Sequence, residues 1–140
     1  MPTNRRRHYR VSLSDALSAH ERALLTGGGR PGIPNPGMAA SAIARPYSGY
    51  HRSIQAKAAA LIQSIASNHG FADGNKRTAT ILLNLLLERS GFVLVFLPDD
   101  GEPNDALADM VLDVVNRRMS FEELVGWLGV RIRRRDRART

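Results

Sequence analysis

The sequence contains no cysteine, and this absence excludes several kinds of chemistry. Without cysteine there is no disulfide framework, no thiolate nucleophile and no cysteine-based metal site. Because cysteine-free chains suit a reducing compartment, we expect a cytoplasmic protein. A chain of 140 residues with 43% hydrophobic residues can still bury a sizeable core without cross-links.

Long apolar runs are also missing. The longest, Ile81 to Leu87, is interrupted by Asn84 and is far shorter than the roughly 20 residues that a membrane-spanning helix needs. The arginines at positions 5–7 are not followed by the apolar region of a signal peptide, and no internal repeat is present. We therefore expect one domain that does not enter a membrane.

Positive charge is scarce in the middle of the chain. The formal net charge is +7, but residues 1–10 carry four arginines, and residues 131–140 carry six arginines and one aspartate. The two ends thus hold nine net positive charges, which leaves −2 for residues 11–130. Short charged ends are usually solvated, and no recognition-helix pattern accompanies them. We predict basic tails at 1–10 and 131–140 around one domain at 11–130, without specific nucleic-acid binding.

Helical periodicity and capping residues fill most of that domain. In the first helix, Leu13, Leu17 and Leu24 form an apolar stripe, and His20 on the same stripe is interpreted as a core-edge histidine rather than a catalytic one. The type of the apolar segment 92–97 stays open, either a strand or packed coil. The expected helices begin at or near Ser12 or Ser14, Met38, Ser53, Asn75, Asn104 and Ser120.

The segment from Thr26 to Gly37 has too many glycines and prolines for a helix and must be a loop or a short hairpin. Two interpretations remain open. It is either a plain connector or a flap, in which an exposed backbone edge aligns a peptide substrate by strand addition.

The helix that begins at Asn75 is apolar on nearly every face, as is typical of a helix surrounded by others. Asp73 and Gly74 supply the turn before it, so its unpaired N–H groups and positive dipole end lie next to a polar segment. Lys76 and Arg77 in its first turn are unfavourable against the dipole, and a bound anion would offset that conflict.

The residues around this helix end match the needs of phosphoryl or nucleotidyl transfer. Main-chain donors from Gly74 to Arg77 can hold a phosphate, and Asp73 can hold Mg²⁺. His69 titrates near neutral pH, which suits a general base, and if the preceding helix extends that far its ring points inward. In the simpler alternative, this segment is an ordinary turn and cap with two solvated cations.

The segment also resembles the signature of the Fic/Doc superfamily, H-x-F-x-D/E-G-N-G-R-x-x-R in Fic proteins and H-x-F-x-D-x-N-K-R-T in Doc (death-on-curing) toxins. The stretch G-G-x-x-P-G-I-P-N-P-G and the following A-I-A-R-P are similar to the Doc flap and its next helix. The resemblance therefore covers roughly residues 12–128. The residues that match the Doc signature are His69, Phe71, Asp73, Asn75, Lys76, Arg77 and Thr78.

The resemblance implies an all-α fold, a compact bundle around a central buried helix with a loop or hairpin flap. It implies His69 as the base, Asp73 as the Mg²⁺ ligand, and Lys76 and Arg77 on the phosphates of ATP. Gly74, Asn75 and Thr78 would complete the nucleotide site. Gly32, Ile33 and Pro34 would form the flap that aligns the target protein.

Two positions depart from the Fic form. Lys76 replaces the second glycine and Thr80 replaces the final arginine, which in Fic enzymes help to seat ATP for AMP transfer. The resemblance thus implies a Doc-like toxin, a Mg-ATP-dependent kinase that phosphorylates a threonine of elongation factor Tu and arrests translation. A Fic-type AMP or nucleotide transferase and an inactive binding module are the alternatives. The chain lacks the S/T-x-x-x-E-G/N inhibitory signature, so a separate Phd-like antitoxin is the expected partner.

Overall fold

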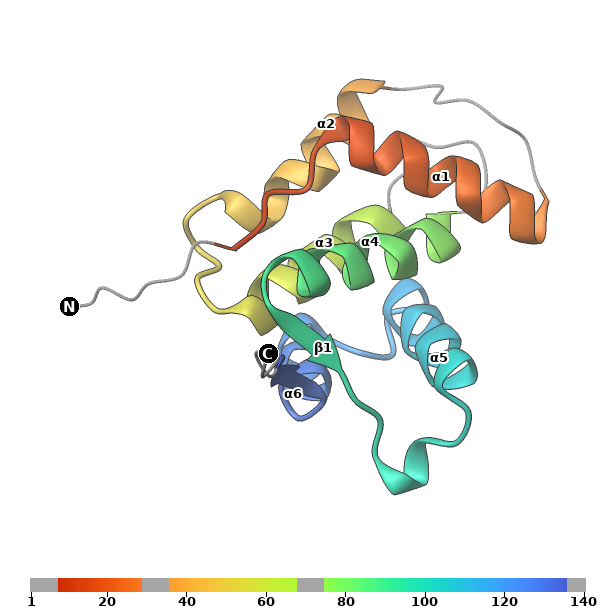
Figure 1. Cartoon of the computed structure of the whole chain (residues 1–140), viewed down its shortest axis with the longest axis vertical. Coiled ribbons are helices and arrows are strands. Elements are labelled where there is room, and N and C mark those ends of the chain that lie inside the picture. The colour runs from red at the N-terminus through yellow and green to blue at the C-terminus, as the bar shows by residue number, and fades with distance from the viewer. Residues whose placement is uncertain (1–7, 29–35, 68–74, 136–140) are drawn as a thin grey trace, which may run out of the picture.

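The computed structural model describes residues 8–28, 36–67 and 75–135. The described chain is helical apart from one two-stranded sheet, which confirms the all-α prediction (Figure 1). Two short 3₁₀ helices, η1 and η2, connect the longer elements. The elements are α1 (Leu13–Gly27), α2 (Pro36–Ala44), η1 (Arg45–Tyr47), α3 (Ile54–Ala66), α4 (Asn75–Arg89), β1 (Phe92–Leu94), η2 (Pro98–Asp100), α5 (Pro103–Val115), α6 (Phe121–Gly129) and β2 (Ile132–Arg134).

Helix α4 is the central element of the bundle. It packs against α1, α3, α5 and β1, and its buried leucines at 82, 83, 86 and 87 are at most 1% exposed. Among the described side chains of α4, those exposed to solvent are Lys76 and Arg77 at its start, Glu88 and Arg89 at its end, and Asn84 between them. The prediction of a helix surrounded by others is therefore confirmed for all but these positions.

The predicted apolar stripe of α1 is only partly correct: Leu13 packs against the core and Leu24 is half-buried, but Leu17 is not part of the buried side. Leu17 is 43% exposed, whereas Ala16, Ala19 and Ala23 are buried. These alanines recur at helical spacing and face α4, because small side chains let two helix backbones approach closely. His20 belongs to the same inner side and is 3% exposed, in line with its interpretation as a core-edge residue.

Three helices start at the capping residues that the sequence indicates, whereas α5 starts at Pro103 without a side-chain cap, one residue before the predicted Asn104. Ser12, Ser53 and Ser120 each accept a hydrogen bond from the backbone N–H three residues later, at 3.1 Å. The Glu123 carboxylate returns a bond to the Ser120 N–H at 2.8 Å, which completes the predicted capping box of α6. None of the helices within the three described ranges is long and apolar enough to cross a membrane.

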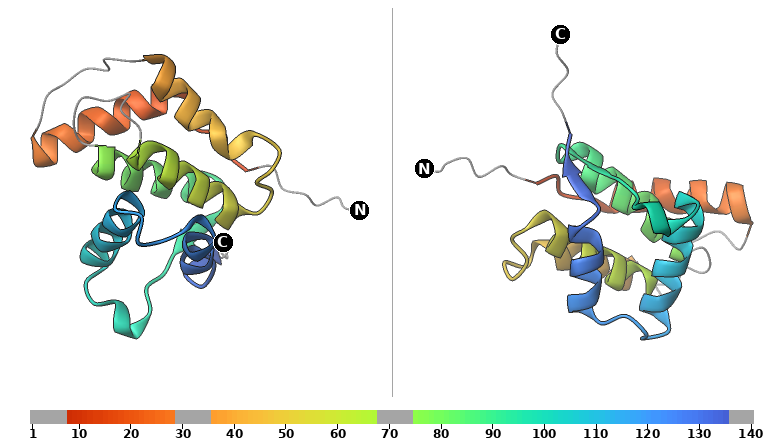
Figure 2. Two further views of the ribbon diagram at one scale, coloured as in Figure 1. Left: turned by 180° about the vertical axis from the view of Figure 1, so that it is seen from behind. Right: turned by 90° about the horizontal axis from the view of Figure 1, so that it is seen from below.

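The two ends of the described chain are part of the fold, so the predicted tails are too long. Strand β2 pairs antiparallel with β1, with Arg134 opposite Phe92 and Ile132 opposite Leu94. At the other end, the Tyr9 N–H donates to Ser90 Oγ at 2.8 Å. Figure 2 shows β2 and the segment before α1 beside the end of α4. A three-residue strand with two arginines has no apolar alternation, which is why the sequence pattern predicted a tail.

Arg131, also assigned to that tail, is 8% exposed and binds the Asp100 carboxylate through two hydrogen bonds, of 2.6 and 2.8 Å. Its guanidinium lies 4.0 Å from the centroid of the Trp127 ring and donates to the Trp127 carbonyl at 2.9 Å. The pair fixes η2 to the start of β2. Hydrogen bonds from Arg131 and from the Leu97 N–H lower the pKa of Asp100 to about 2.

The low pKa of Asp100 predicts a pH-dependent loss of stability. Because its folded-state pKa lies below the ordinary value of 3.8, the contribution is complete above about pH 4 and is lost as the pH falls toward about 2. Asp100→Asn should lower Tm near neutral pH and flatten the decline of Tm in this window. Thermal melts across the window test this, with Asp113→Asn, in the exposed pair with Arg118 at 3.8 Å, as the control. Equal slopes in wild type and Asp100→Asn would contradict the assignment.

Candidate functional site

Only part of the predicted site lies within the described residues. His69, Phe71, Asp73 and Gly74 lie outside them, as do the flap residues Gly32, Ile33 and Pro34. Asn75 is described as the first residue of α4, and Lys76, Arg77 and Thr78 follow it in the first turn. The structure therefore describes the helices on either side of residues 68–74, which we call the motif segment, and of residues 29–35, which we call the flap segment.

Helices α3 and α4 flank the motif segment in the sequence. They pack against each other, and residues 68–74 connect the end of α3 to the start of α4. Helix α3 ends at Ala66, where the Ser67 N–H donates to the carbonyls of Gln63 and Ile65. The predicted continuation of its inward stripe to His69 falls outside the described residues. The orientation of the His69 ring stays a prediction.

The start of α4 is electropositive. This helix of 15 residues has no acidic residue in its first turn, and the Lys76 side chain is exposed there. Its first N–H groups have no acceptors within the helix, and the helix dipole places positive potential at this end. The donors present therefore fit a phosphate group.

Arg77 links the start of α4 to the end of α1. Its Nε donates to the Ala23 carbonyl at 3.0 Å, and Nη2 donates to the Gly28 carbonyl at 2.8 Å. A cation is favourable there because the last carbonyls of a helix carry negative potential. Gly28 has φ of 74°, a conformation that favours glycine, and the flap segment follows it directly. The remaining guanidinium N–H groups can still meet an anion, so phosphate binding by Arg77 stays a prediction.

Arg77→Lys should keep the charge but weaken this link, because an ammonium group cannot reproduce the guanidinium geometry. We expect a loss of about 1 kcal/mol in the free energy of unfolding. The Gly28 amide, which donates to the Leu24 carbonyl at 2.7 Å, should exchange faster with deuterium. Arg22→Lys, an exposed position on α1, is the control. If the Gly28 amide of Arg77→Lys exchanged at the wild-type rate, the Arg77 contacts would not be needed to hold the end of α1.

The two threonines of the motif differ in environment. The Thr78 side chain is completely buried, and its Oγ1 has no hydrogen-bond partner among the described residues. Its hydroxyl thus faces the interior, and its predicted contact with a nucleotide stays a prediction. Thr80 Oγ1 donates to the Lys76 carbonyl one turn earlier, at 3.3 Å. Thr80 replaces the arginine of the Fic signature with a short side chain bonded to its own helix.

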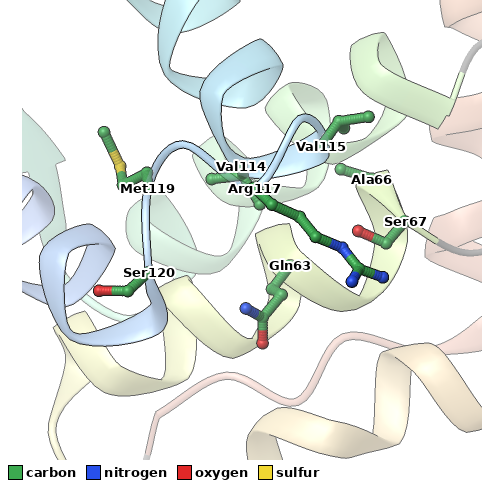
Figure 3. A pocket seen from close by; sticks show the side chains of 8 residues that line it. All are labelled: Gln63, Ala66, Ser67, Val114, Val115, Arg117, Met119 and Ser120. Carbon is green, nitrogen blue, oxygen red and sulfur yellow. The ribbon is translucent and has the colours of Figure 1, made fainter.

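A pocket that the sequence gave no signal for lies beside the end of α3. It has a volume of about 580 Å³ and is bordered by Gln63 of α3, by Ser67 just after that helix and by the turn between α5 and α6. Arg117 extends across it toward Ser67 (Figure 3). At φ of 60°, Arg117 is the one non-glycine residue of the described chain in the left-handed region. Its charge suits the negative ends of α3 and α5, which explains its position without a ligand.

Metal binding has no ready-made site in residues 8–28, 36–67 and 75–135, where no group of three or more His, Asp or Glu side chains could hold an ion. Asp73, the predicted Mg²⁺ ligand, lies outside these residues.

Two comparisons place the chain among known proteins. The model of the Fic/DOC family matches residues 10–87, which run from before α1 to near the end of α4. The chain is also similar to Toxin Doc of Mycolicibacterium smegmatis (strain ATCC 700084 / mc(2)155). The two are 45% identical over 120 residues, covering 81% of this chain and 86% of that toxin.

Proposed function

The chain belongs to the Fic/DOC family, and on this premise we propose that it is a Doc-like toxin that transfers a phosphoryl group from ATP to a protein hydroxyl. The proposed target is a threonine of elongation factor Tu, whose modification would arrest translation in the cytoplasm. The similarity to Toxin Doc along most of the chain supports the toxin assignment.

In the proposed reaction, the start of α4 binds the phosphates through its free N–H groups, with Lys76 and Arg77 as cationic donors. His69 takes the proton of the target hydroxyl while the hydroxyl oxygen forms a bond to the terminal phosphorus of ATP. The bond from that phosphorus to the bridging oxygen breaks, and ADP leaves with the electron pair. A bound Mg²⁺, held by Asp73, would neutralise phosphate charge. Gly32, Ile33 and Pro34 would align the target segment.

The observation that favours phosphoryl over nucleotidyl transfer is the first turn of α4. Lys76 places an exposed side chain where Fic proteins have glycine, and Thr80, bonded to the Lys76 carbonyl, replaces the Fic arginine. A lysine there crowds the site in which Fic proteins seat ATP for AMP transfer, and so favours presentation of the terminal phosphate. Transfer of AMP is the second candidate.

A separate antitoxin is part of the proposal, because the chain has no inhibitory helix signature of its own. We propose that a disordered segment of a Phd-like antitoxin folds onto this domain and restrains it.

One incubation tests the reaction. The purified protein is mixed with labelled ATP and a cell lysate, and the labelled protein is identified and its intact mass measured. A phosphoryl increment on elongation factor Tu is the expected result. An AMP increment would replace the proposal with the second candidate, and no labelling would indicate a binding module.

A further inference from the structure

The two arginine-rich ends of the chain meet at one place in the fold. The Tyr9 N–H binds Ser90 Oγ at 2.8 Å, and the Arg135 N–H binds the carbonyl of the adjacent Gly91 at 2.9 Å. Residues near opposite ends of the sequence are thus attached to consecutive residues at the end of α4 (Figure 2). The sequence showed two separate basic ends, and the fold joins them.

Five exposed arginines surround this junction, and we call them the arginine cluster. The guanidinium of Arg89 lies 5.3 Å from the Tyr9 ring centroid, and that of Arg134 lies 5.9 Å from the Phe92 ring centroid. Arg10 lies 4.8 Å from the Tyr47 ring, whose hydroxyl donates to the Tyr9 carbonyl at 2.7 Å. The members of the cluster are Arg10, Arg89, Arg133, Arg134 and Arg135.

The cluster has little neutralising charge within the described chain. Glu88 lies 3.8 Å from Arg135, and its side chain is 66% exposed, so this pair is weak. Asp15 already accepts hydrogen bonds from the Tyr9 hydroxyl at 2.6 Å and from the Ser12 N–H at 3.0 Å. Five guanidinium groups face two carboxylates, so the junction has a net positive potential.

We infer that the arginine cluster binds the phosphate backbone of nucleic acid without reading its sequence. Arginine binds phosphates through paired N–H donors. Arg133 and Arg134 lie on β2 and Arg135 follows it, so their exposed guanidinium groups offer several donors to neighbouring phosphates. The aromatic rings of the cluster are covered by arginines rather than free to stack on bases. Contacts of this kind carry affinity but no base specificity.

An anionic membrane is a poorer match for this surface. Membrane-surface binding combines basic residues with exposed apolar side chains that insert between lipids. Among the described residues, none of the exposed large apolar side chains belongs to the cluster or to the rings beneath it. Those side chains are Leu17, Leu25, Met38, Tyr50, Leu112 and Val130.

The cluster lies at the opposite end of α4 from the candidate active site. The 15 residues of this helix separate the two by about 20 Å. Nucleic acid bound at the cluster would therefore leave the start of α4 free for a protein substrate. The inference does not depend on the proposed function, because it concerns binding alone.

The test measures fluorescence anisotropy of labelled duplex DNA and duplex RNA of one sequence with the full chain, over a series of salt concentrations. We expect binding to both, with affinity that falls steeply as salt rises. Arg133→Gln/Arg134→Gln should weaken DNA binding at least about tenfold at low salt. The variant should also reduce the slope of log K against log salt by about 2, because each lost phosphate contact changes that slope by roughly 0.9.

The matched control is Arg117→Gln/Arg118→Gln, which removes two exposed arginines from the turn between α5 and α6. It should bind nucleic acid like the wild type, and thermal melts verify that both variants fold. If the two double variants lose affinity equally, net charge rather than the cluster is responsible and the inference is wrong. It is equally wrong if the wild type binds neither duplex but binds polyglutamate or phosphatidylserine vesicles.

Discussion

His69→Ala is expected to lower the rate of phosphoryl transfer by about 10²- to 10⁴-fold, the usual contribution of a general base. Without an imidazole, the target hydroxyl would have to lose its proton to water as it attacks, while ATP would keep the contacts proposed for it at the start of α4. The loss should therefore appear in the rate of labelling, and the Kd for ATP should change little. Single-turnover labelling and calorimetric titration measure the two quantities.

The control for this experiment is His51→Ala. His51 precedes the start of α3, whose 13 residues span about 20 Å, and its ring lies 5.3 Å from that of Phe121. This variant should label at the wild-type rate. Full labelling by His69→Ala would disprove its role as the base without disproving the transfer reaction. No labelling by the wild type would disprove the reaction itself.

Arg131→Met is expected to cost about 3 kcal/mol in the free energy of unfolding, because removing one partner leaves the other charge nearly buried and unpaired. Methionine keeps much of the apolar contact with the Trp127 ring but cannot donate to Asp100 or to the Trp127 carbonyl. For a domain of this size, Tm should fall by about 10 °C. Urea unfolding followed by circular dichroism measures the free energy.

Arg118→Met is the matched control, since the Arg118 side chain is 68% exposed and its pair with Asp113 is long, at 3.8 Å. That variant should lose less than about 0.5 kcal/mol. Adding Asp100→Leu to Arg131→Met should recover part of the loss, because both charges are then absent. If the two single arginine variants were equally stable, the Arg131 pair would contribute no more than a surface contact.

Helices with a strong local signal could be predicted from the sequence. Ser53 and Ser120 start helices as their side chains indicate, and the leucines of α4 predicted a surrounded helix before any contact was known. The motif from His69 to Thr78 also identified the family, because its residue types and spacing are local properties of the chain. Such features depend on neighbours within a few residues, which a sequence displays directly.

Other features depended on residues far apart in the chain. The sequence favoured the leucines of α1 for burial, but close packing on α4 selected the alanines. Arg131 and the arginines of β2 had the pattern of a solvated tail, and only Asp100, Trp127 and β1 make them part of the fold.

The sequence alone thus determined the helices, the serine caps of three of them and the family, whereas the tertiary structure decided which side of α1 is buried, where the two basic ends meet and what Arg77 contacts. The physical reason is that capping and periodicity are set within one or two helical turns. A buried ion pair, a strand pair and a helix contact each require a partner that only folding brings near.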